Sequence, residues 1–265
     1  MRKLLLQKLK LPKVQLSFAL IAIYLSAFGQ LPFEQYIRVL IVSCVSTILF
    51  DLLISYVRIR KLFIPHAAMA TGMIIAILVD PTLAWYKISS IAFISIAIKN
   101  FIRINNKHIF NPAVIGLLLG GYIFGAPVAW WGTSFQYSGN LNIQTLILYI
   151  ILLSPLYISV YRMRRHFTIV AFFITYILLT LATSGSFSPN VFLTTLLNPT
   201  IIFFSIVMLP EPITSPFSRN KQLLFGTSVA FLNFIFASNF IAENIFIPDP
   251  PLASLLIANL IFFRR

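Results

Sequence analysis

Two short stretches of the chain place a carboxylate directly before a proline at the end of an apolar run. Asp80 begins the stretch DPT, and Glu211 begins EPITSP, in which Thr214 and Ser215 supply two hydroxyl groups. Proline ends a helix and fixes its own backbone angle, so polar groups in such a turn are held near the helix end. These four residues are therefore candidates for contact with a polar ligand or an ion.

A simpler interpretation of EPITSP stays open. Loops at helix ends are most often connectors, and Glu211 can pair with Arg219 or Lys221 a few residues further on. The matching stretch at Asp80 favours the functional interpretation, because a connector has no need to repeat the same motif.

Two further stretches place a polar residue before a proline at the start of an apolar run. Asn111 and Pro112 open FNPAVIG, and Asp249 precedes Pro250 in IPDPPLAS. Asn and Asp are favoured N-caps and proline is favoured in the first turn, so both stretches predict helix starts. Helix N-termini suit anions, phosphates and carbonyl oxygens, because they present unpaired N–H groups. Asn111 and Pro112 are therefore candidate ligand contacts, with helix entry alone as the alternative.

One carboxylate, Asp51, lies inside an apolar segment. Carboxylates within a membrane are costly and are candidates for function, so Asp51 and Asp80 are candidates for an ion or charge pathway. A buried partner, or an ion pair with Arg58, is the alternative for Asp51. The three histidines of the chain share no spacing that is typical of metal ligands, so no metal site is predicted.

The elements that must hold these residues are membrane helices. Of the 265 residues, 59% are hydrophobic and only 10% are charged, and the mean hydropathy is +0.92. Soluble domains carry about a quarter charged residues, so the composition predicts an all-α, polytopic membrane protein in contact with a lipid bilayer. The formal charge of +14 then reflects membrane topology, and no nucleic-acid partner is predicted.

The apolar runs number ten, and we expect each to be a transmembrane segment. The third and tenth are the shortest, and Asn198 and Pro199 interrupt the eighth. The expected segments are residues 14–31, 36–57, 66–79, 83–98, 110–126, 141–160, 167–183, 191–209, 223–240 and 251–263.

The distribution of basic residues fits ten crossings. With a cytoplasmic N-terminus, the cytoplasmic segments carry 18 of the 20 Lys and Arg residues, and only Arg38 and Lys87 fall outside. This bias is the one that the positive-inside rule predicts. We expect a multi-pass protein of the cytoplasmic (inner) membrane with both termini in the cytoplasm. The basic start is interpreted as a tail before a retained first helix.

The paired motifs occur in the same order in both parts of the chain, which indicates an internal repeat. The expected halves are residues 1–140 and 141–265, with five helices each. Because five is odd, the second half must be inverted relative to the first. Glu211 and Asn111 then lie toward the cytoplasm, and Asp80 and Asp249 lie toward the outside. Inverted repeats with short or interrupted helices place a site between the halves.

Several motifs, in order, resemble those of one membrane-protein family. They are the DPT turn, FNPAVIG, a Trp-rich loop, the basic turn RMRRHF and EPITSPFSRNKQLLFG. From about Ile64 onward, the chain resembles a family of membrane subunits from two ion-translocating redox complexes, the Na⁺-translocating NADH:quinone reductase and the Rnf electron transport complex. The resemblance implies a ten-helix inverted-repeat fold, flavin bound in the membrane, and electron transfer coupled to Na⁺ or H⁺ movement.

The resemblance also implies roles for particular residues. The family's FNPA asparagine lies near a non-covalently held flavin and corresponds to Asn111, whereas a second family asparagine is replaced by His108. The family attaches FMN phosphate to a threonine of an SGAT-like motif, and Leu141 stands at that position here. We therefore expect flavin (FMN or riboflavin) without a covalent bond. Thr133, the only threonine of that loop, is a further candidate contact, and the TSP stretch matches a cofactor-adjacent or structural position.

The expected function is that of an integral membrane electron-transfer protein that holds flavin between its halves. Its expected partners are other subunits of a membrane redox complex and a soluble flavin or iron–sulfur reductase. The chain has no GxGxxG, Walker A, CxxC or nucleophile-elbow motif, so it holds no complete active site for NADH oxidation, ATP-driven transport or hydrolysis. A cofactor-free channel or transporter for a small polar solute is the alternative, and a scaffold subunit without ligand is a third possibility.

Overall fold

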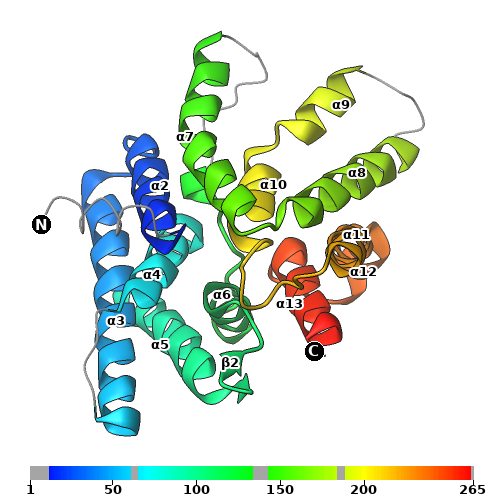
Figure 1. The fold of residues 1–265 in the computed structure, drawn as a ribbon. Coiled ribbons are helices and arrows are strands. Elements are labelled where there is room, and N and C mark those ends of the chain that lie inside the picture. The colour runs from blue at the N-terminus through cyan, green and yellow to red at the C-terminus, as the bar shows by residue number, and fades with distance from the viewer. Residues whose placement is uncertain (1–11, 61–64, 134–142, 184–188, 264–265) are drawn as a thin grey trace, which may run out of the picture.

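The structure, a computed structural model, describes residues 12–60, 65–133, 143–183 and 189–263. Helices dominate these residues, which confirms the all-α class (Figure 1). The elements of the first half are α2 (Pro12–Ser26), α3 (Phe33–Ile59), α4 (His66–Leu78), α5 (Trp85–Phe101), β1 (Arg103–Ile104), β2 (Lys107–His108), α6 (Pro112–Phe124) and the 3-10 turn η1 (Trp131–Thr133).

The second half begins with α7 and contains shorter elements. They are α7 (Ile143–Arg162), α8 (His166–Thr183), α9 (Pro189–Leu196), α10 (Pro199–Phe203), the π-helical turn η2 (Phe204–Met208), α11 (Arg219–Phe236), α12 (Asn239–Asn244) and α13 (Pro250–Phe262).

Three helices begin where the sequence places Asn or Asp before proline. Asn111, Asn198 and Asp249 each accept hydrogen bonds from first-turn backbone N–H groups of α6, α10 and α13, at 2.8–3.4 Å. Proline occupies the first turn of each of these helices. The predicted helix starts at Asn111 and Asp249 are confirmed, and so is the predicted interruption at Asn198.

A short hairpin between α5 and α6 was not predicted. Strands β1 and β2 pair antiparallel, with Arg103 opposite His108. Asn105 and Asn106 connect them with positive φ angles of 51° and 61°, which Asn tolerates and which two-residue hairpin turns require. The hairpin reverses the chain so that α6 can pack beside α5.

The helix contacts of the first half recur in the second. α3 packs on α4 and α5, and α5 packs on α6; correspondingly, α8 packs on η2 and α11, and α11 packs on α13. The halves meet where α2 contacts α7 and where α6 contacts α13, and Figure 1 shows α2–α5 on one side of this boundary and α8 and α11–α13 on the other. The two acid–proline turns therefore occupy equivalent positions, after α4 and after η2.

Small residues allow the closest of these helix contacts. A Cβ atom on Gly116 of α6 would lie 1.8 Å from the Ser95 hydroxyl oxygen of α5. A Cβ atom on Gly226 of α11 would lie 2.3 Å from the Thr168 carbonyl oxygen of α8. Backbone approach of this kind is common between membrane helices, and here it explains both glycines by helix packing.

Two helices of the described residues are long and apolar enough to cross a membrane: α3, over Phe33–Arg58, and α8, over His166–Thr183. Five other apolar helices have only 10–17 residues, so the predicted count of ten spans is not confirmed. The predicted boundary between the halves at residues 140–141, the basic N-terminal tail and Leu141 lie outside the described residues.

Candidate functional site

The EPITSP stretch forms a turn that its own hydrogen bonds close; we call residues 211–216 the inner turn. Ser215 donates through its backbone N–H and its hydroxyl to the carbonyl oxygen of Glu211, at 2.9 and 2.7 Å. The Thr214 hydroxyl donates to Oε2 of Glu211 at 3.2 Å. Thr214 and Ser215 are buried, so the polar groups of the turn are held in one arrangement.

Arg165 holds the inner turn from the segment between α7 and α8. Its Nη2 donates to the carbonyl oxygen of Pro212 at 3.1 Å, and its guanidinium lies 5.1 Å from the centre of the Phe217 ring. Only 4% of Arg165 is exposed. The planar guanidinium suits both contacts, and it places a positive charge inside the protein beside the turn.

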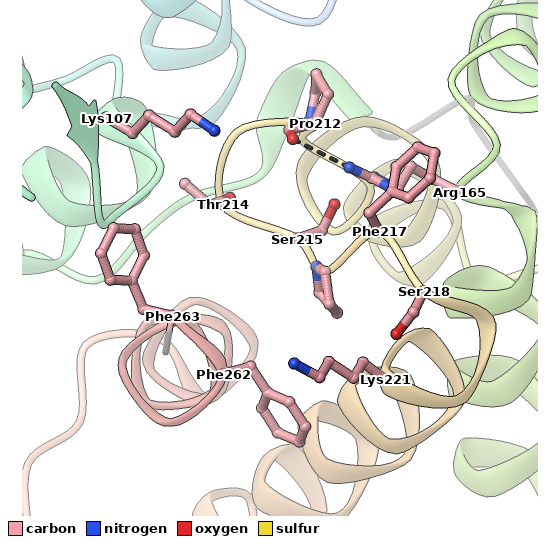
Figure 2. A pocket seen from close by; sticks show the side chains of 11 residues that line it. Lys107, Arg165, Pro212, Thr214, Ser215, Phe217, Ser218, Lys221, Phe262 and Phe263 are labelled. Atoms are coloured by element: carbon pink, nitrogen blue, oxygen red, sulfur yellow. Dashed lines mark hydrogen bonds between the residues drawn. The ribbon is translucent and has the colours of Figure 1, made fainter. Parts of the chain in front are cut away.

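The inner turn forms one wall of a pocket of about 520 Å³. Lys107 comes from the hairpin of the first half, whereas the other lining residues belong to the second half (Figure 2). The pocket therefore lies where the two halves meet. Its side chains are of three main kinds: the cations Lys107, Arg165 and Lys221, the hydroxyl-bearing Thr214, Ser215 and Ser218, and the aromatic Phe217, Phe262 and Phe263.

Helix α11 begins at the edge of this pocket. Its N-cap residue Ser218 makes no side-chain capping hydrogen bond, so the first-turn N–H groups lack the partner that such a cap supplies. Buried Gln222 fixes this end, because its Nε2 donates to the carbonyl oxygens of Arg164 and Phe217 at 2.8 and 2.7 Å. The positive end of the helix dipole thus adds to the charge of the lysines.

His108 joins the hairpin to the inner turn. Its Nε2 lies 3.7 Å from Oε1 of Glu211, and its Nδ1 lies 2.9 Å from the carbonyl oxygen of Phe110. A carbonyl oxygen only accepts, so Nδ1 carries a proton and the contact with Glu211 is ionic when Nε2 is protonated as well. His108, Glu211, Thr214 and Ser215, which the sequence proposed separately, are brought together here.

Asn111 and Pro112 follow closely in the chain and serve α6. The Asn111 side-chain oxygen accepts hydrogen bonds from the N–H groups of Ala113 and Val114 at 3.1 and 3.4 Å, and Pro112 begins the helix. Both residues are buried and neither lines the pocket. Their capping role is therefore observed, and their contact with flavin stays a prediction.

The DPT stretch forms an equivalent turn at the other end of α5; we call residues 80–82 the outer turn. Oδ1 of Asp80 accepts from the Thr82 N–H at 2.8 Å and from its hydroxyl at 2.7 Å. Arg38 donates to the carbonyl oxygen of Pro81 at 2.9 Å, just as an arginine does in the inner turn. The space beside the outer turn is only about 10 Å³, enough for about one water molecule.

The loop after α6 covers the outer turn. The Ala129 N–H donates to the Leu78 carbonyl oxygen at 2.8 Å, and Nε1 of Trp130 donates to Oδ2 of Asp249 at 2.5 Å. The Thr133 hydroxyl donates to the carbonyl oxygen of Trp130 at 2.7 Å. Thr133 and Asp80 therefore lie at the opposite end of α5 from the inner turn and do not join the pocket.

Asp249, in the segment between α12 and α13, has a carboxyl group with a raised pKa. Burial raises the pKa of its carboxyl to about 6, while the hydrogen bonds from Trp130 and from the Leu252 N–H oppose that rise. Burial disfavours the charged form of a carboxyl group. Asp249 therefore takes up a proton at a pH at which an ordinary aspartate is ionised.

Asp51 is paired within the first half. Its Oδ1 accepts from Nζ of Lys99 at 2.9 Å and from Nδ2 of Asn100 at 3.2 Å. Of the two alternatives that the sequence offered, a buried partner is the one observed, because Arg58 donates to the carbonyl oxygen of Asn100 and not to Asp51. Burial and then the charge of Arg58 lower the pKa of Arg103, and Asp51 opposes this effect. The cluster joins α3 to α5, and a role for Asp51 in ion movement stays a prediction.

The three cations of the pocket were not proposed from the sequence as ligand contacts. Lys107, Arg165 and Lys221 were assigned as cytoplasmic charges, although Lys107 and Lys221 lie within a few residues of the FNPA and EPITSP motifs. That proximity was the available signal for a cationic site. Nothing in the sequence indicated the bond from Arg165 to Pro212, which joins residues 47 positions apart.

No protein-family model matches the chain, and no curated protein matches it. The resemblance to the redox-complex subunits therefore rests on the ordered motifs alone. The function that these motifs suggest is therefore a proposal, and the side chains of the pocket are the basis on which it is argued below.

Proposed function

We propose that the chain is an integral membrane subunit that binds flavin beside the inner turn and passes electrons within an ion-translocating redox complex of the Rnf or Na⁺-translocating NADH:quinone reductase type. The observation that carries the proposal is the pocket of about 520 Å³ where the halves meet, with its cations, hydroxyls and aromatic rings. Pockets that bind small molecules and cofactors commonly have volumes of about 300–1,000 Å³. Thr214 and Ser215, which the sequence singled out, line it.

Outward-facing apolar side chains support the membrane part of the proposal. On α3, Ile41, Val45, Leu49, Leu53 and Val57 form an exposed stripe, each four residues from the next. Soluble monomers rarely expose a continuous patch of this kind, whereas a membrane helix presents it to lipid. We propose ten spans in two inverted five-helix repeats, with both termini in the cytoplasm. Helices such as α6 and α13 fall short of the ~20 residues of a full crossing, as the interrupted helices around membrane sites do.

The lining of the pocket fits a flavin. The rings of Phe217, Phe262 and Phe263 offer apolar surface to a flat aromatic group. Thr214 and Ser215 already donate their hydroxyl protons to Glu211, so their oxygens are left to accept from ligand N–H or O–H groups. Bound flavin supplies the electron-transfer chemistry, and the protein supplies position and local charge. The cations favour electron uptake, because they stabilise added negative charge.

The proposed partners follow from what the chain lacks. No GxGxxG motif for a nicotinamide cofactor occurs in the sequence, so electrons must reach the flavin from another protein. A soluble flavin or iron–sulfur reductase, together with other membrane subunits, fits this requirement and the resemblance to the redox-complex subunits.

The test is the visible spectrum of the detergent-purified protein, before and after denaturation. We expect flavin absorbance that denaturation releases from the chain. A preparation that stays colourless after flavin is added would contradict the proposal.

A second candidate function is a channel or transporter for a small polar solute. The favouring observation is the pair of equivalent turns, one beside about 520 Å³ of space and the other beside about 10 Å³. Transporters built from inverted repeats expose a central site to one side at a time. Solute flux into liposomes without a redox partner would support this function, and bound flavin without flux would exclude it.

The ten-span topology has its own test. A reporter fused after Asn140 follows the fifth proposed span, so we expect its signal outside the cytoplasm. A cytoplasmic signal at this position would overturn the inverted-repeat arrangement while leaving the pocket unaffected.

A further inference from the structure

The loop between α6 and η1 closes the small space beside the outer turn. Ala126, Pro127 and Val128 line this space of about 10 Å³ from the loop, and Val79 and Asp80 line it from the turn. Residues of α5 and α6 form most of the remaining wall. The space is therefore small because the loop lies against it, and we call residues 126–130 the outer cover.

Two glycines with different surroundings bound the outer cover. Gly125, which ends α6, has a φ of 64°, and a Cβ atom there would meet no described atom within 4 Å. A Cβ atom on Gly132 would lie 3.1 Å from the Cα atom and the carbonyl oxygen of Ile77. The chain is thus fixed on α4 at Gly132, whereas it has room to turn at Gly125, and a few residues of this kind suffice for a hinge.

Trp130 ties the outer cover to the second half through its side chain. Its Nε1 donates to Oδ2 of Asp249 at 2.5 Å, and its ring meets the ring of Phe203 edge to face at 6.3 Å. On the side of the first half, the backbone N–H groups of Ala129 and Trp130 share one acceptor, the Leu78 carbonyl oxygen, at 2.8 and 3.3 Å. The indole ring is therefore the part of the cover that spans the two halves.

The backbone of Trp130 opposes this closed arrangement. Its φ of 51° lies in the left-handed region, where the Cβ atom of a residue other than glycine is crowded. Such a conformation persists only where surrounding contacts hold it, and it is common at clamps and switches. Here the contacts of the indole with Asp249 and Phe203 hold it, so a loss of these contacts releases the backbone as well.

We propose that the outer cover is a gate, which stays closed while the indole of Trp130 is bound to Asp249 and opens by turning at Gly125 when that contact breaks. Release of the left-handed backbone at Trp130 favours the open form. This inference goes beyond the proposed function, because the cover lies at the opposite end of α5 from the inner pocket. It supplies what alternating access between inverted repeats requires, a closed end that can open.

The experiment measures how fast a cysteine beneath the outer cover reacts with a charged, water-soluble thiol reagent. Cys44, the only cysteine of the chain, is replaced by alanine. Val79→Cys then places the reporter in the space under the cover, where Val79 is 2% exposed. Val229→Cys, at a fully buried position of α11, is the matched reporter of global unfolding. Mass spectrometry follows the labelling of each full-length, detergent-purified protein.

Trp130→Phe keeps an aromatic ring but removes the donor to Asp249. It should speed labelling of the Val79→Cys reporter about tenfold, because hydrogen bonds to charged groups are stronger than neutral ones. Trp85→Phe, at an exposed tryptophan outside the cover, is the matched control and should label as wild type.

Trp130→Ala and Trp130→Gly isolate the backbone strain, since both lose the ring and the donor and differ in the cost of a positive φ. The alanine variant should label about fivefold faster than the glycine variant, because only glycine adopts this φ without crowding. The Val229→Cys reporter should stay unlabelled in every variant.

Three results would overturn the inference. The first is a rate at the Val79→Cys reporter that Trp130→Phe does not change. The second is an equal rate in the alanine and glycine variants, because the strained backbone would then not favour opening. The third is labelling of the Val229→Cys reporter as fast as that of the Val79→Cys reporter, because the cover would then open only when the whole protein unfolds.

Discussion

The outer and inner turns share one backbone arrangement but differ in the space that lies beside them. In each, an acid precedes a proline after a short helical element. An arginine earlier in the chain, at or directly before the start of a long helix, donates to the proline carbonyl oxygen, at 2.9 Å from Arg38 and 3.1 Å from Arg165. The outer turn borders a space of only about 10 Å³, whereas the inner turn borders a pocket of about 520 Å³. The turn itself therefore does not decide whether a site forms.

What differs is the material that covers each turn. Over the outer turn, the loop after α6 returns to α4, and Trp130 bonds across to Asp249 of the other half. Beside the inner turn lie a two-stranded hairpin and the end of α13, which bring Lys107 and two aromatic rings but leave space between them. Two turns of equivalent backbone arrangement can thus differ in whether they border an open pocket, because different segments lie beside them.

The largest expected effect is from Arg165→Met, with Arg38→Met as its matched control. Arg165 is 4% exposed, and its loss removes both its charge-assisted hydrogen bond to Pro212 and its contact with the Phe217 ring, which together cost about 3 kcal/mol of unfolding free energy. Arg38 is only partly buried, and we expect a cost of about 1 kcal/mol there. Thermal unfolding, detected by size-exclusion chromatography, measures the loss of stability in both variants. Equal losses would mean that the two turns are held equally firmly.

The closure at the outer turn should depend on pH through Asp249. Its carboxyl has a pKa of about 6 in the folded protein against an ordinary 3.8, so the folded state holds the proton more tightly than the unfolded state. Its stabilising contribution is therefore complete below pH 3.8 and is lost as pH rises through 6, a loss of about 3 kcal/mol.

Asp249→Asn is the control for this pH effect, because asparagine keeps an oxygen that can cap α13 but does not titrate. Between about pH 4 and 7, the free energy of unfolding of wild type should fall through the titration of Asp249. The Asp249→Asn variant should not show this fall. Parallel profiles would contradict the assignment of the effect to Asp249.

Helices α6 and α13, which are capped by Asn111 and Asp249, allow a smaller comparison. Asn111→Leu removes the acceptor of two first-turn N–H groups of α6, and we expect it to cost about 1 kcal/mol and to lower flavin content. Asn111→Asp restores the type of cap found in α13 and should recover both. Flavin content that is unchanged in the leucine variant would remove Asn111 from the site.

The smallest effect is expected at Thr133, whose hydroxyl bonds to Trp130 at the outer end. Thr133→Val should leave flavin affinity unchanged, whereas Thr214→Val, in the pocket wall, should weaken it. A denaturing gel viewed under ultraviolet light should show no flavin fluorescence on the wild-type chain. Fluorescence that Thr133→Val abolishes would instead assign a covalent flavin to this residue.

Local signals determined much of the fold. All ten predicted apolar segments contain helix, and the starts of α6 and α13 were predicted because an N-cap and a proline act within one helical turn. The hairpin was missed, although Asn105–Asn106 suits the turn, because two-residue strands have too few side chains for an alternating pattern.

The residues of the site were only partly predictable. Glu211, Thr214 and Ser215 are visible in the sequence because prolines flank them, but their grouping with His108 needs contact between the halves. For Asp51 the sequence offered a buried partner or Arg58 as alternatives, and the partner is Lys99 on the neighbouring helix. Spacing along one helix cannot identify an ion-pair partner that helix packing supplies from another helix.

The sequence alone thus determined the helical class, the breaks at proline and the repetition of the acid–proline turns, because these depend on short-range backbone geometry and on apolar composition. Only the tertiary structure decided that Trp130 meets Asp249 and that Lys107, Arg165 and Lys221 line the pocket beside the inner turn. Those outcomes depend on contacts between residues up to 119 positions apart, where packing of whole helices, and not local preference, sets which groups meet.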